Sequence, residues 1–387
     1  MSSTKYNYII IGAGAAGLHL ALAMLDDEFY RDKKILILDK IEKNKNDRTW
    51  CFWEKGEGRW DKILTKSWNQ GLVVAKNENI QLELNAYRYK MLQSSDFYRM
   101  AKSKIEAHKN VVWLTEEVTK TRQLENTVEV YTGEEKYTAD YVFDSRIPKS
   151  YSLKHPEYLN IAQHFKGWMI ETEAAVFDDQ RFTMMDFSLK DGNTTSFTYV
   201  LPISSKKALV EFTYFTSNLV EPSVYESFME NYISEKLDIE KYKIVDEEQG
   251  VIPMTNFPFS NFSSQNMIKI GTAGGWVKAS SGYSFKNCEK ESQKIIEKLK
   301  SKSANLHEAQ NPKYKHYDKI FLEVLTKNND FGEELFYRMY KNNKIETIFK
   351  FLDENSSWKE DLEIITNLSS KPFIKALIRH AKSGFKI

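Results

Sequence analysis

Residues 12–17 read GAGAAG, with glycines in the spacing G-x-G-x-x-G. The hexapeptide follows an apolar, β-branched run at residues 6–11 and opens the run at residues 15–25, which is rich in helix-forming side chains. A second apolar run follows at residues 34–38. This order predicts a strand, a glycine turn, a helix and a second strand parallel to the first, which is the opening unit of a Rossmann-type α/β fold.

The same turn has the features of a dinucleotide-binding site. Gly12 permits a tight turn, Gly14 lets the backbone approach a pyrophosphate at the helix N-terminus, and Gly17 allows the helix to pack on the sheet. Asp39 ends the second strand, where its carboxylate suits an adenosine ribose and disfavours a 2′-phosphate. The alternative is an ordinary glycine-rich turn of an α/β protein.

We expect FAD rather than NAD, by analogy with flavoproteins that combine an early fingerprint with a second glycine segment far downstream, here residues 271–282. The predicted cofactor-binding residues are Gly12, Gly14, Ala15, Ala16, Gly17, Asp39, Lys40, Arg48, Gly271, Thr272, Gly274, Gly275 and Lys278. Arg48 is expected at a flavin phosphate or, alternatively, as a cap of its loop. Lys278 is expected near the flavin's pyrimidine side or, alternatively, as a solvated loop lysine.

Composition limits the classes of function. The 387 residues carry 55 Lys and Arg against 54 Asp and Glu, so no overall field attracts nucleic acid. Two cysteines, Cys51 and Cys288, argue against a disulfide framework and favour a cytoplasmic protein. The histidines show no metal-ligand spacing, and we expect no metal. The uncharged run 6–25 contains three glycines, which favours a strand and a helix over a signal peptide or membrane span.

The rest of the chain changes character twice. A helix at 94–108 and strands at 111–114, 128–131 and 141–143 are expected to extend the first sheet. Residues 168–215 are rich in Phe, Tyr, Thr and Val between turns, which is typical of an antiparallel sheet.

A helix at 223–236, an extended piece at 250–255 and a strand at 267–270 are expected next. Beyond residue 289 the pattern is helical, with breaks expected near Pro312, 328–329 and 356–357.

Four further segments, taken with the fingerprint, resemble one family. They are DRTWCFW at 47–53, TYVLP before LVEFTYF at 198–215, GVIPM at 250–254 and GTAGGWVKASSGYSF at 271–285. In this order, over residues 5 to 290, they resemble the bacterial FAD-dependent lycopene cyclases, which turn the open ends of lycopene into β-rings. The C-terminal hundred residues match no motif of this resemblance.

The resemblance implies a flavoprotein of the para-hydroxybenzoate hydroxylase type. It implies reduced FAD acting without net redox change, NAD(P)H as the reductant, and a polyene substrate drawn from a membrane. The acidic motif of the family matches at Glu211, but its neighbouring acid is Phe212 here. Many related flavoproteins carry an aspartate where this chain has Thr272, whose hydroxyl cannot replace the charge.

Glu211 lies among mostly apolar neighbours in a predicted strand. Burial there would raise its pKa and keep it protonated, as a general acid requires, so we expect it to protonate the terminal double bond of lycopene. A solvent-facing glutamate on an edge strand is the alternative. Asp186, also in an apolar stretch, is expected to pair with Glu211, to position it, or to cap a turn.

A dry pocket with π-electron density would protect and stabilise a carbocation. The predicted substrate-binding residues are Trp50, Phe52, Trp53, Tyr199, Tyr214 and Phe215. Ordinary core packing is the alternative for each of these aromatic side chains.

Residues 371–387 carry five basic side chains at helical spacing and no acid. Apolar residues fill the opposite side, so the pattern indicates either a helix on an anionic membrane or a terminal helix packed on its own domain. We therefore predict a cytoplasmic protein associated peripherally with the inner face of the membrane.

The sequence thus predicts an α/β lycopene β-cyclase with an FAD-binding Rossmann-type domain, an antiparallel β-sheet substrate domain and a helical C-terminal region. The alternatives are an FAD-dependent hydroxylase or prenyl reductase of the same fold, and a carotenoid-binding protein that keeps its flavin for structure. The predicted boundaries are 1–72, 94–148 and 265–300 for the FAD domain, 73–93 and 149–264 for the substrate domain, and 301–387 for the helices.

Overall fold

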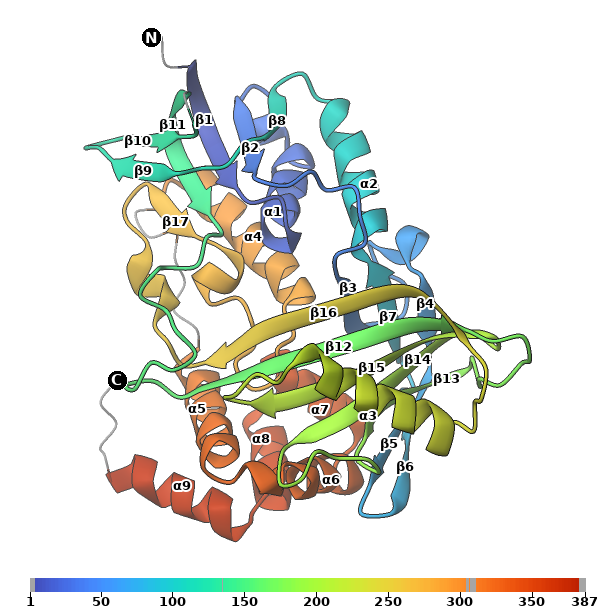
Figure 1. Ribbon diagram of the computed structural model, residues 1–387. Helices are drawn as coiled ribbons and strands as arrows, with labels where there is room; N and C mark the ends of the chain where they lie inside the picture. The colour runs from blue at the N-terminus through green and yellow to red at the C-terminus, as the bar shows by residue number, and fades with distance from the viewer. Residues whose placement is uncertain (1–3, 134, 304–305, 307–310, 383–387) are drawn as a thin grey trace.

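The computed structural model describes residues 4–133, 135–303, 306 and 311–382, with the side chains of 381 and 382 excepted. Within these residues, two seven-stranded sheets and one three-stranded sheet are arranged along the molecule, and helices gather at both ends (Figure 1).

The first sheet is the predicted nucleotide-binding unit. Strand β1 (Thr4–Ile11), helix α1 (Ala15–Leu25) and strand β2 (Ile35–Asp39) follow one another as expected, and β1 pairs in parallel with β2. The isoleucines of β1 are buried: Ile10 packs with residues of α1, and Ile9 and Ile11 pack on the other face with Val118, Val128 and Val130. The sheet order is β8-β2-β1-β11-β10-β9, with β17 beside β11; the added strands are β8 (Val111–Thr115), β9 (Lys120–Gln123), β10 (Val128–Tyr131), β11 (Lys136–Asp144) and β17 (Met267–Lys269).

Two further helices complete this lobe. Helix α2 (Ser94–Glu106) and helix α4 (Phe285–Lys300) both contact α1. Helix α4 follows the second glycine segment, so the chain returns to the first sheet after passing through the second (Figure 1). The two glycine segments, far apart in the sequence, therefore lie in the same lobe.

The second sheet has the order β16-β12-β15-β14-β13-β5-β6 and is antiparallel except where β13 meets β5. Its strands are β5 (Gln70–Ala75), β6 (Glu78–Glu83), β12 (Asn160–Glu171), β13 (Arg181–Asp186), β14 (Ser196–Ser204), β15 (Lys207–Thr216) and β16 (Lys243–Thr255). Helix α3 (Pro222–Glu235) covers one face. The C-terminal helices pack against the other.

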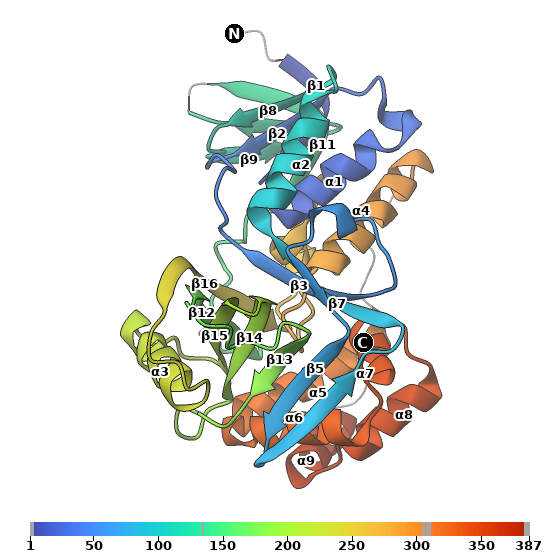
Figure 2. The same ribbon diagram turned by 90° about the vertical axis from the view of Figure 1, so that its right-hand side faces the viewer.

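The small sheet lies between the two larger ones (Figure 2). It pairs β3 (Thr49–Lys55) and β4 (Lys66–Trp68) with β7 (Tyr87–Gln93). None of these strands was predicted. Each is short and aromatic-rich, and β7 packs through Tyr87, Tyr89 and Met91 against the core shared with the C-terminal helices.

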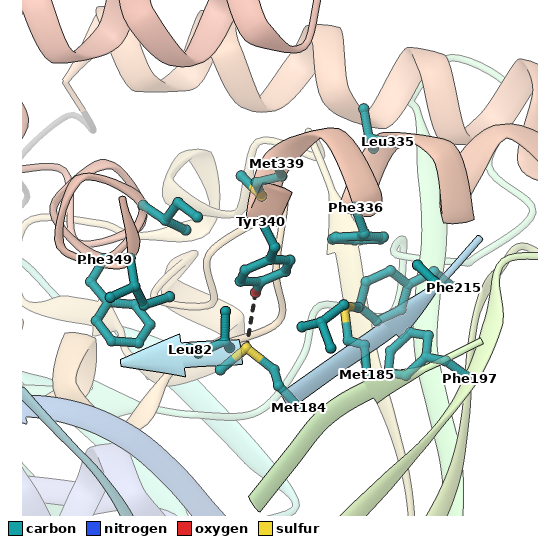
Figure 3. Packing of buried hydrophobic residues seen from close by; sticks show 14 of the residues in the cluster. Leu82, Met184, Met185, Phe197, Phe215, Leu335, Phe336, Met339, Tyr340 and Phe349 are labelled. Atoms are coloured by element: carbon teal, nitrogen blue, oxygen red, sulfur yellow. Dashed lines mark hydrogen bonds between the residues drawn. The ribbon is translucent and has the colours of Figure 1, made fainter. Parts of the chain in front are cut away.

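The C-terminal region is helical, as predicted. It contains α5 (Pro312–Lys327), α6 (Gly332–Asn342), α7 (Ile345–Leu352), α8 (Trp358–Asn367) and α9 (Lys371–Lys382). Pro312 begins α5 and Ser357 caps α8 in a capping box, which confirms two of the predicted breaks. Figure 3 shows apolar side chains of these helices, including Phe336, Met339 and Tyr340, facing Met184 and Met185 of β13.

Candidate active site

The glycine turn leaves room for a ligand at the start of α1. Gly12 has a positive φ of 98°, and a Cβ at Gly17 would lie 1.9 Å from the carbonyl oxygen of Gly12, so both positions require glycine. A Cβ at Gly14 would meet no atom within 4 Å, and no side chain caps the helix after it. An open backbone at a helix N-terminus suits a phosphate group.

The second glycine segment packs against this turn. Residues Gly271–Gly274 form a short 3-10 helix that contacts α1, and Gly271 has a positive φ. A Cβ at Gly271 would come within 2.9 Å of the Cβ of Ala16. The structure thus brings the two predicted halves of the cofactor site together.

The other predicted cofactor residues lie at the end of β2 and in the loop after it. Asp39 accepts hydrogen bonds from the backbone N–H groups of Ala13 and Ile41, at 2.7 and 2.9 Å. Lys40 is exposed. The Arg48 guanidinium donates to the backbone carbonyls of Asp47 and Gln249, so it joins this loop to β16.

Glu211 is buried in the second sheet, with only 8% of its surface exposed. Strand β15 lies between β12 and β14, so Glu211 is not the solvent-facing edge residue of the alternative interpretation. Thr213 donates its hydroxyl proton to Glu211 Oε1 over 2.7 Å. Burial, reinforced by the charge of Glu248, raises the pKa of Glu211 well above its ordinary value.

Glu248 is the residue that sequence reasoning missed. In the sheet register Gly167 of β12 pairs with Glu211 on one side and with Glu248 on the other. The two carboxyl groups line the same pocket, and Thr49 donates to Glu248 Oε2 over 2.6 Å. Burial raises the pKa of Glu248 too, against the effect of the hydrogen bond from Thr49. The site therefore contains two carboxyl groups from different strands.

A pocket of about 650 Å³ surrounds this pair. The residues that line it include Trp50 and Cys51 of β3, Tyr199 of β14, the loop residues 281–284 and Phe285 of α4. The hydroxyl groups of Tyr283 and Tyr89 form a hydrogen bond of 3.2 Å, in which either can be the donor. Aromatic side chains line several sides of the pocket, and Glu211 and Glu248 are the acidic residues of its lining.

An apolar cavity of about 830 Å³ adjoins the acid pocket. Tyr199, Ser281 and Tyr283 line both spaces. The further lining comes from β13, β15 and the C-terminal helices; it includes Met184, Phe215, Phe336, Met339, Phe373 and Leu377. This apolar lining suits the chain of an extended apolar ligand whose end lies at Glu211.

A model of the lycopene cyclase protein family matches residues 7–378. The chain belongs to this family. The resemblance read from the sequence is confirmed, and the match extends beyond the motifs into helix α9. No curated protein matches the chain in sequence.

Solved structures similar to this lycopene cyclase family member are flavoproteins. A geranylgeranyl bacteriochlorophyll reductase-like protein from Thermoplasma acidophilum is 11% identical, with a TM-score of 0.60, over 97% of this chain and 96% of that one. A flavoprotein/dehydrogenase from Cytophaga hutchinsonii is 12% identical, with a TM-score of 0.61, over 98% and 100%.

The halogenase PltM, solved with phloroglucinol and FAD, is 11% identical, with a TM-score of 0.60, over 98% and 91%. At such identities the likeness concerns the fold. The predicted fold class, an α/β FAD-binding flavoprotein fold with several sheets and a helical C-terminal region, is confirmed.

In this lycopene cyclase family member Asp186 and Glu211 do not meet. Asp186 pairs in register with Thr198, which pairs with Phe212, so Asp186 lies on the α3 face of the sheet, opposite Glu211. There it accepts hydrogen bonds from the Tyr232 hydroxyl at 2.7 Å and from the Ser188 N–H at 2.8 Å. The second bond is that of a turn-capping aspartate.

The predicted substrate-binding aromatics separate into three groups. Trp50 and Tyr199 line the acid pocket, and Tyr199 and Phe215 line the apolar cavity. Tyr214 lies on the α3 face, where its ring stacks on His164. Phe52 and Trp53 line neither space; they stack on Phe285 and Phe349 respectively.

Lys278 is buried rather than solvated, with 3% of its side chain exposed. Its ammonium group lies 2.9 Å from carboxylate oxygens of both Asp318 and Glu354. Burial alone would lower the pKa of Lys278, but the two carboxylates outweigh it and raise that pKa. Lys278 therefore ties the second glycine segment to the C-terminal region.

Two absences hold for the described residues. No group of three His, Cys, Asp or Glu side chains there is arranged to hold a metal ion. No helix in that part of the chain has the length and apolar character that crossing a membrane requires.

Proposed function

We propose that this chain is an FAD-dependent lycopene β-cyclase of carotenoid biosynthesis, which closes the open ψ-ends of lycopene into β-rings without net redox change. Family membership supports the substrate class. One observation supports the reaction type above all: the buried carboxyl group of Glu211 has a raised pKa and faces a pocket that adjoins an apolar cavity.

Residues of this chain fit the cofactor. Gly14 and the first turn of α1 would receive the pyrophosphate, Asp39 the adenosine ribose, and Gly271 to Gly275 the adjoining part of the flavin. When bound in reduced form, FAD supplies negative charge that stabilises a carbocation without entering the product. The reduced form and NAD(P)H as its reductant remain predictions.

The residues of the pocket perform the proton chemistry. Glu211 donates its proton to the terminal double bond, so a C–H bond forms and a tertiary cation is left. The neighbouring double bond attacks that cation and closes the ring, and a proton leaves an adjacent carbon to give the β-ring. Tyr199, Tyr283 and Phe285 exclude water and present π-electron density to the cation.

Conversion of lycopene in living cells tests the proposal. The chain is expressed in cells that accumulate lycopene, and the pigments are separated by chromatography. A β-ring product is expected, and its absence with FAD-loaded protein would overturn the cyclase. Stoichiometric consumption of NAD(P)H would instead identify the hydroxylase or prenyl reductase, and bound but unaltered lycopene the carotenoid-binding protein.

Membrane association from the cytoplasmic side is part of the same proposal. Helix α9 buries Phe373 and Ala376, whereas Ile374 and Ile378 are 47% and 49% exposed beside the exposed Lys371 and Lys375. Exposed apolar and basic side chains on one helix suit an anionic lipid surface. The buried side of α9 supports packing on the domain, and its exposed side supports the proposed membrane contact. The side chain of Lys382 and residues 383–387, with Lys386, lie outside the described part.

Sedimentation with anionic vesicles tests the membrane contact. The variant Ile374→Ser/Ile378→Ser is expected to bind less, because apolar area would be lost from the contact. The variant Ile41→Ser/Ile147→Ser, which changes two exposed isoleucines elsewhere, serves as the control and should bind like the unchanged protein. Equal binding of all three proteins would exclude α9 as the contact.

A further inference from the structure

We propose that Glu211 and Glu248 share a single proton across Gly167, and that Glu248 is the positioning residue that keeps this proton at the site. The inference rests on the proposed function and deepens it. It replaces the pair of adjacent acids expected from the family motif with a pair from two strands.

The sheet register carries the proposal. Glu248, Gly167, Glu211 and Tyr199 form one row across β16, β12, β15 and β14. Paired residues in an antiparallel sheet point to the same face, so both carboxyl groups lie on the pocket side. Since neighbouring strands lie about 4.8 Å apart, strands β16 and β15 are about 9.6 Å apart and their side chains can meet only over β12.

Gly167 leaves the space that this meeting requires. A Cβ there would lie 3.2 Å from the Cβ of Glu211 and 3.4 Å from its Cγ. These contacts are tight, and a larger side chain would fill the gap between the two acids. Glycine weakens a strand interior, so its presence in the middle of this sheet marks a close approach of other groups.

Electrostatics favours a single proton on the two acids. Burial and the charge of Glu248 raise the pKa of Glu211, so two ionised carboxylates facing each other across Gly167 are disfavoured. Thr49 donates to Glu248, and the positive charge of Arg48 also favours its ionised form. Glu248 is therefore the carboxylate, and Glu211 holds the proton.

The titratable groups that face Glu211 stay neutral, and two charges of opposite sign act on Glu248. Tyr199 of β14, Tyr283 of the downstream loop and Cys51 of β3 face Glu211, and burial raises the pKa of each, so they stay neutral. The charge of Asp246, on β16 itself, disfavours the ionised form of Glu248, whereas the charge of Arg48 favours it. The pair thus carries one negative charge and one proton.

A shared proton suits a reaction that consumes none. Glu211 gives its proton to the alkene carbon, the ring C–C bond closes, and the C–H bond that breaks returns a proton to the pair. Between these two steps both carboxylates are ionised, and their charge attracts the cation. Two acids sharing one proton restore themselves without a proton from water.

An infrared titration of the FAD-loaded protein tests proton sharing directly. The band of protonated carboxyl groups is followed against pH in the unchanged protein, Glu211→Gln, Glu248→Gln and the control Glu247→Gln. We expect part of this infrared band to persist to neutral pH in the unchanged protein and to be absent in Glu211→Gln. In Glu248→Gln it should titrate lower by about one pH unit, because the neighbouring charge is gone.

The control shares the strand but not the face. Glu247 is the residue before Glu248, is exposed, and forms an ion pair with Lys166. Glu247→Gln should therefore leave the band unchanged. Gly167→Ala provides a second variant that keeps both acids. It should shift the band in the same direction as Glu248→Gln, since the added methyl group separates the carboxyl groups.

Cyclisation rates against pH give the matching functional readout. The alkaline limb should move to lower pH in Glu248→Gln and stay in place in Glu247→Gln. Bands that titrate alike in Glu248→Gln, Gly167→Ala and the unchanged protein would overturn proton sharing even if lycopene is cyclised. The expected band shifts without any conversion of lycopene would overturn the proposed function and leave proton sharing supported.

Discussion

Two pairs of acids lie near Ser281 and Tyr283, each with one buried and one half-buried member, and a lysine distinguishes them. Glu211 and Glu248 face one another across Gly167, whereas Asp318 and Glu354 both contact the ammonium group of Lys278. The first pair keeps a proton because burial disfavours two charges there. In the second group the ammonium group of Lys278 lowers the pKa of Asp318, against the larger raising effect of burial. A single lysine thus decides whether buried acids act as a proton source or as an electrostatic tie.

The largest effect is expected where the proton source is removed. Glu211→Gln should lower the cyclisation rate by about 10²- to 10⁴-fold, because the amide has no proton to donate to the alkene. Product formation by purified, FAD-loaded protein is the measurement. Asp186→Asn, on the opposite face of the sheet, is the comparison variant and should retain far more activity. Equal losses in both variants would remove the distinction between the two faces.

The electrostatic tie should fail when its cation is removed. Lys278→Met leaves Asp318 and Glu354 buried beside one another, which should lower the free energy of unfolding by about 3 to 5 kcal/mol. Unfolding in urea provides the measurement. The surface pair Lys341 and Glu78 is the control, and Lys341→Met should change the free energy of unfolding far less, because solvent screens an exposed ion pair.

A partial rescue would sharpen this result. Adding Asp318→Asn to Lys278→Met removes one of the stranded charges, so part of the lost stability should return. A double variant as unstable as the single one would show that packing, rather than charge, holds the C-terminal helices.

Glu211 and the surface residue Glu360 predict opposite dependences of stability on pH. The pKa of Glu211 is higher in the folded than in the unfolded state, so its stabilising effect is present at low pH and is lost as pH rises above about 4.3 toward the folded value. The unchanged protein should therefore lose stability relative to Glu211→Gln by up to about 1.4 kcal/mol per pH unit in that range.

Glu360 provides the opposite sign. A hydrogen bond from Lys350, then those from Ser357, lower its pKa to about 2. Its contribution is present above the unfolded pKa and is lost as pH falls toward 2. Glu360→Gln should therefore differ from the unchanged protein at neutral pH and converge with it in acid. Chemical unfolding at a series of pH values measures both variants.

The smallest effect concerns the hydroxyl group beside Glu211. Thr213 donates to Glu211 and lowers its pKa, so Thr213→Val should raise that pKa further and move the alkaline limb of activity to higher pH. The lost hydrogen bond is worth about 1 kcal/mol. This direction is opposite to that expected for Glu248→Gln, and a shift to lower pH in the pH-rate profile would contradict it.

The sequence predicts the nucleotide-binding unit closely because its signals are local. The helix expected at 15–25 is α1, and the glycine turn has the conformation that its spacing requires. Burial of Glu211 was likewise predicted, since alternation along one strand places its neighbours on known faces. The same alternation predicts that Tyr214 and Glu211 lie on opposite faces of the strand, and in the structure they do.

The second acid could not be predicted because it depends on pairing between distant strands. Strand β16 was expected only at 250–255, whereas it begins at Lys243. Its first half is an exposed, charged edge without apolar alternation, so Glu248 resembled surface sequence. Phe212, which replaces the family's neighbouring acid, points to α3 and stacks on Phe228. A carboxyl group at 212 would therefore face away from Glu211.

The buried role of Lys278 also depends on contacts that the sequence does not reveal. Its partners lie 40 and 76 residues further along the chain. A lysine in a glycine-rich loop is usually solvated, and only the packing of α5 and the turn after α7 excludes water from it. The predicted domain boundaries remain predictions.

The path of the chain through the sheets has a practical consequence. The first sheet takes strands from 4–144 and from 267–269, while the second takes strands from 70–83 and from 160–255. Among the described strands, one cut in the backbone cannot yield two fragments that each hold a whole sheet. Limited proteolysis should therefore leave nicked but associated protein, and pieces made separately should regain structure only when they are produced together.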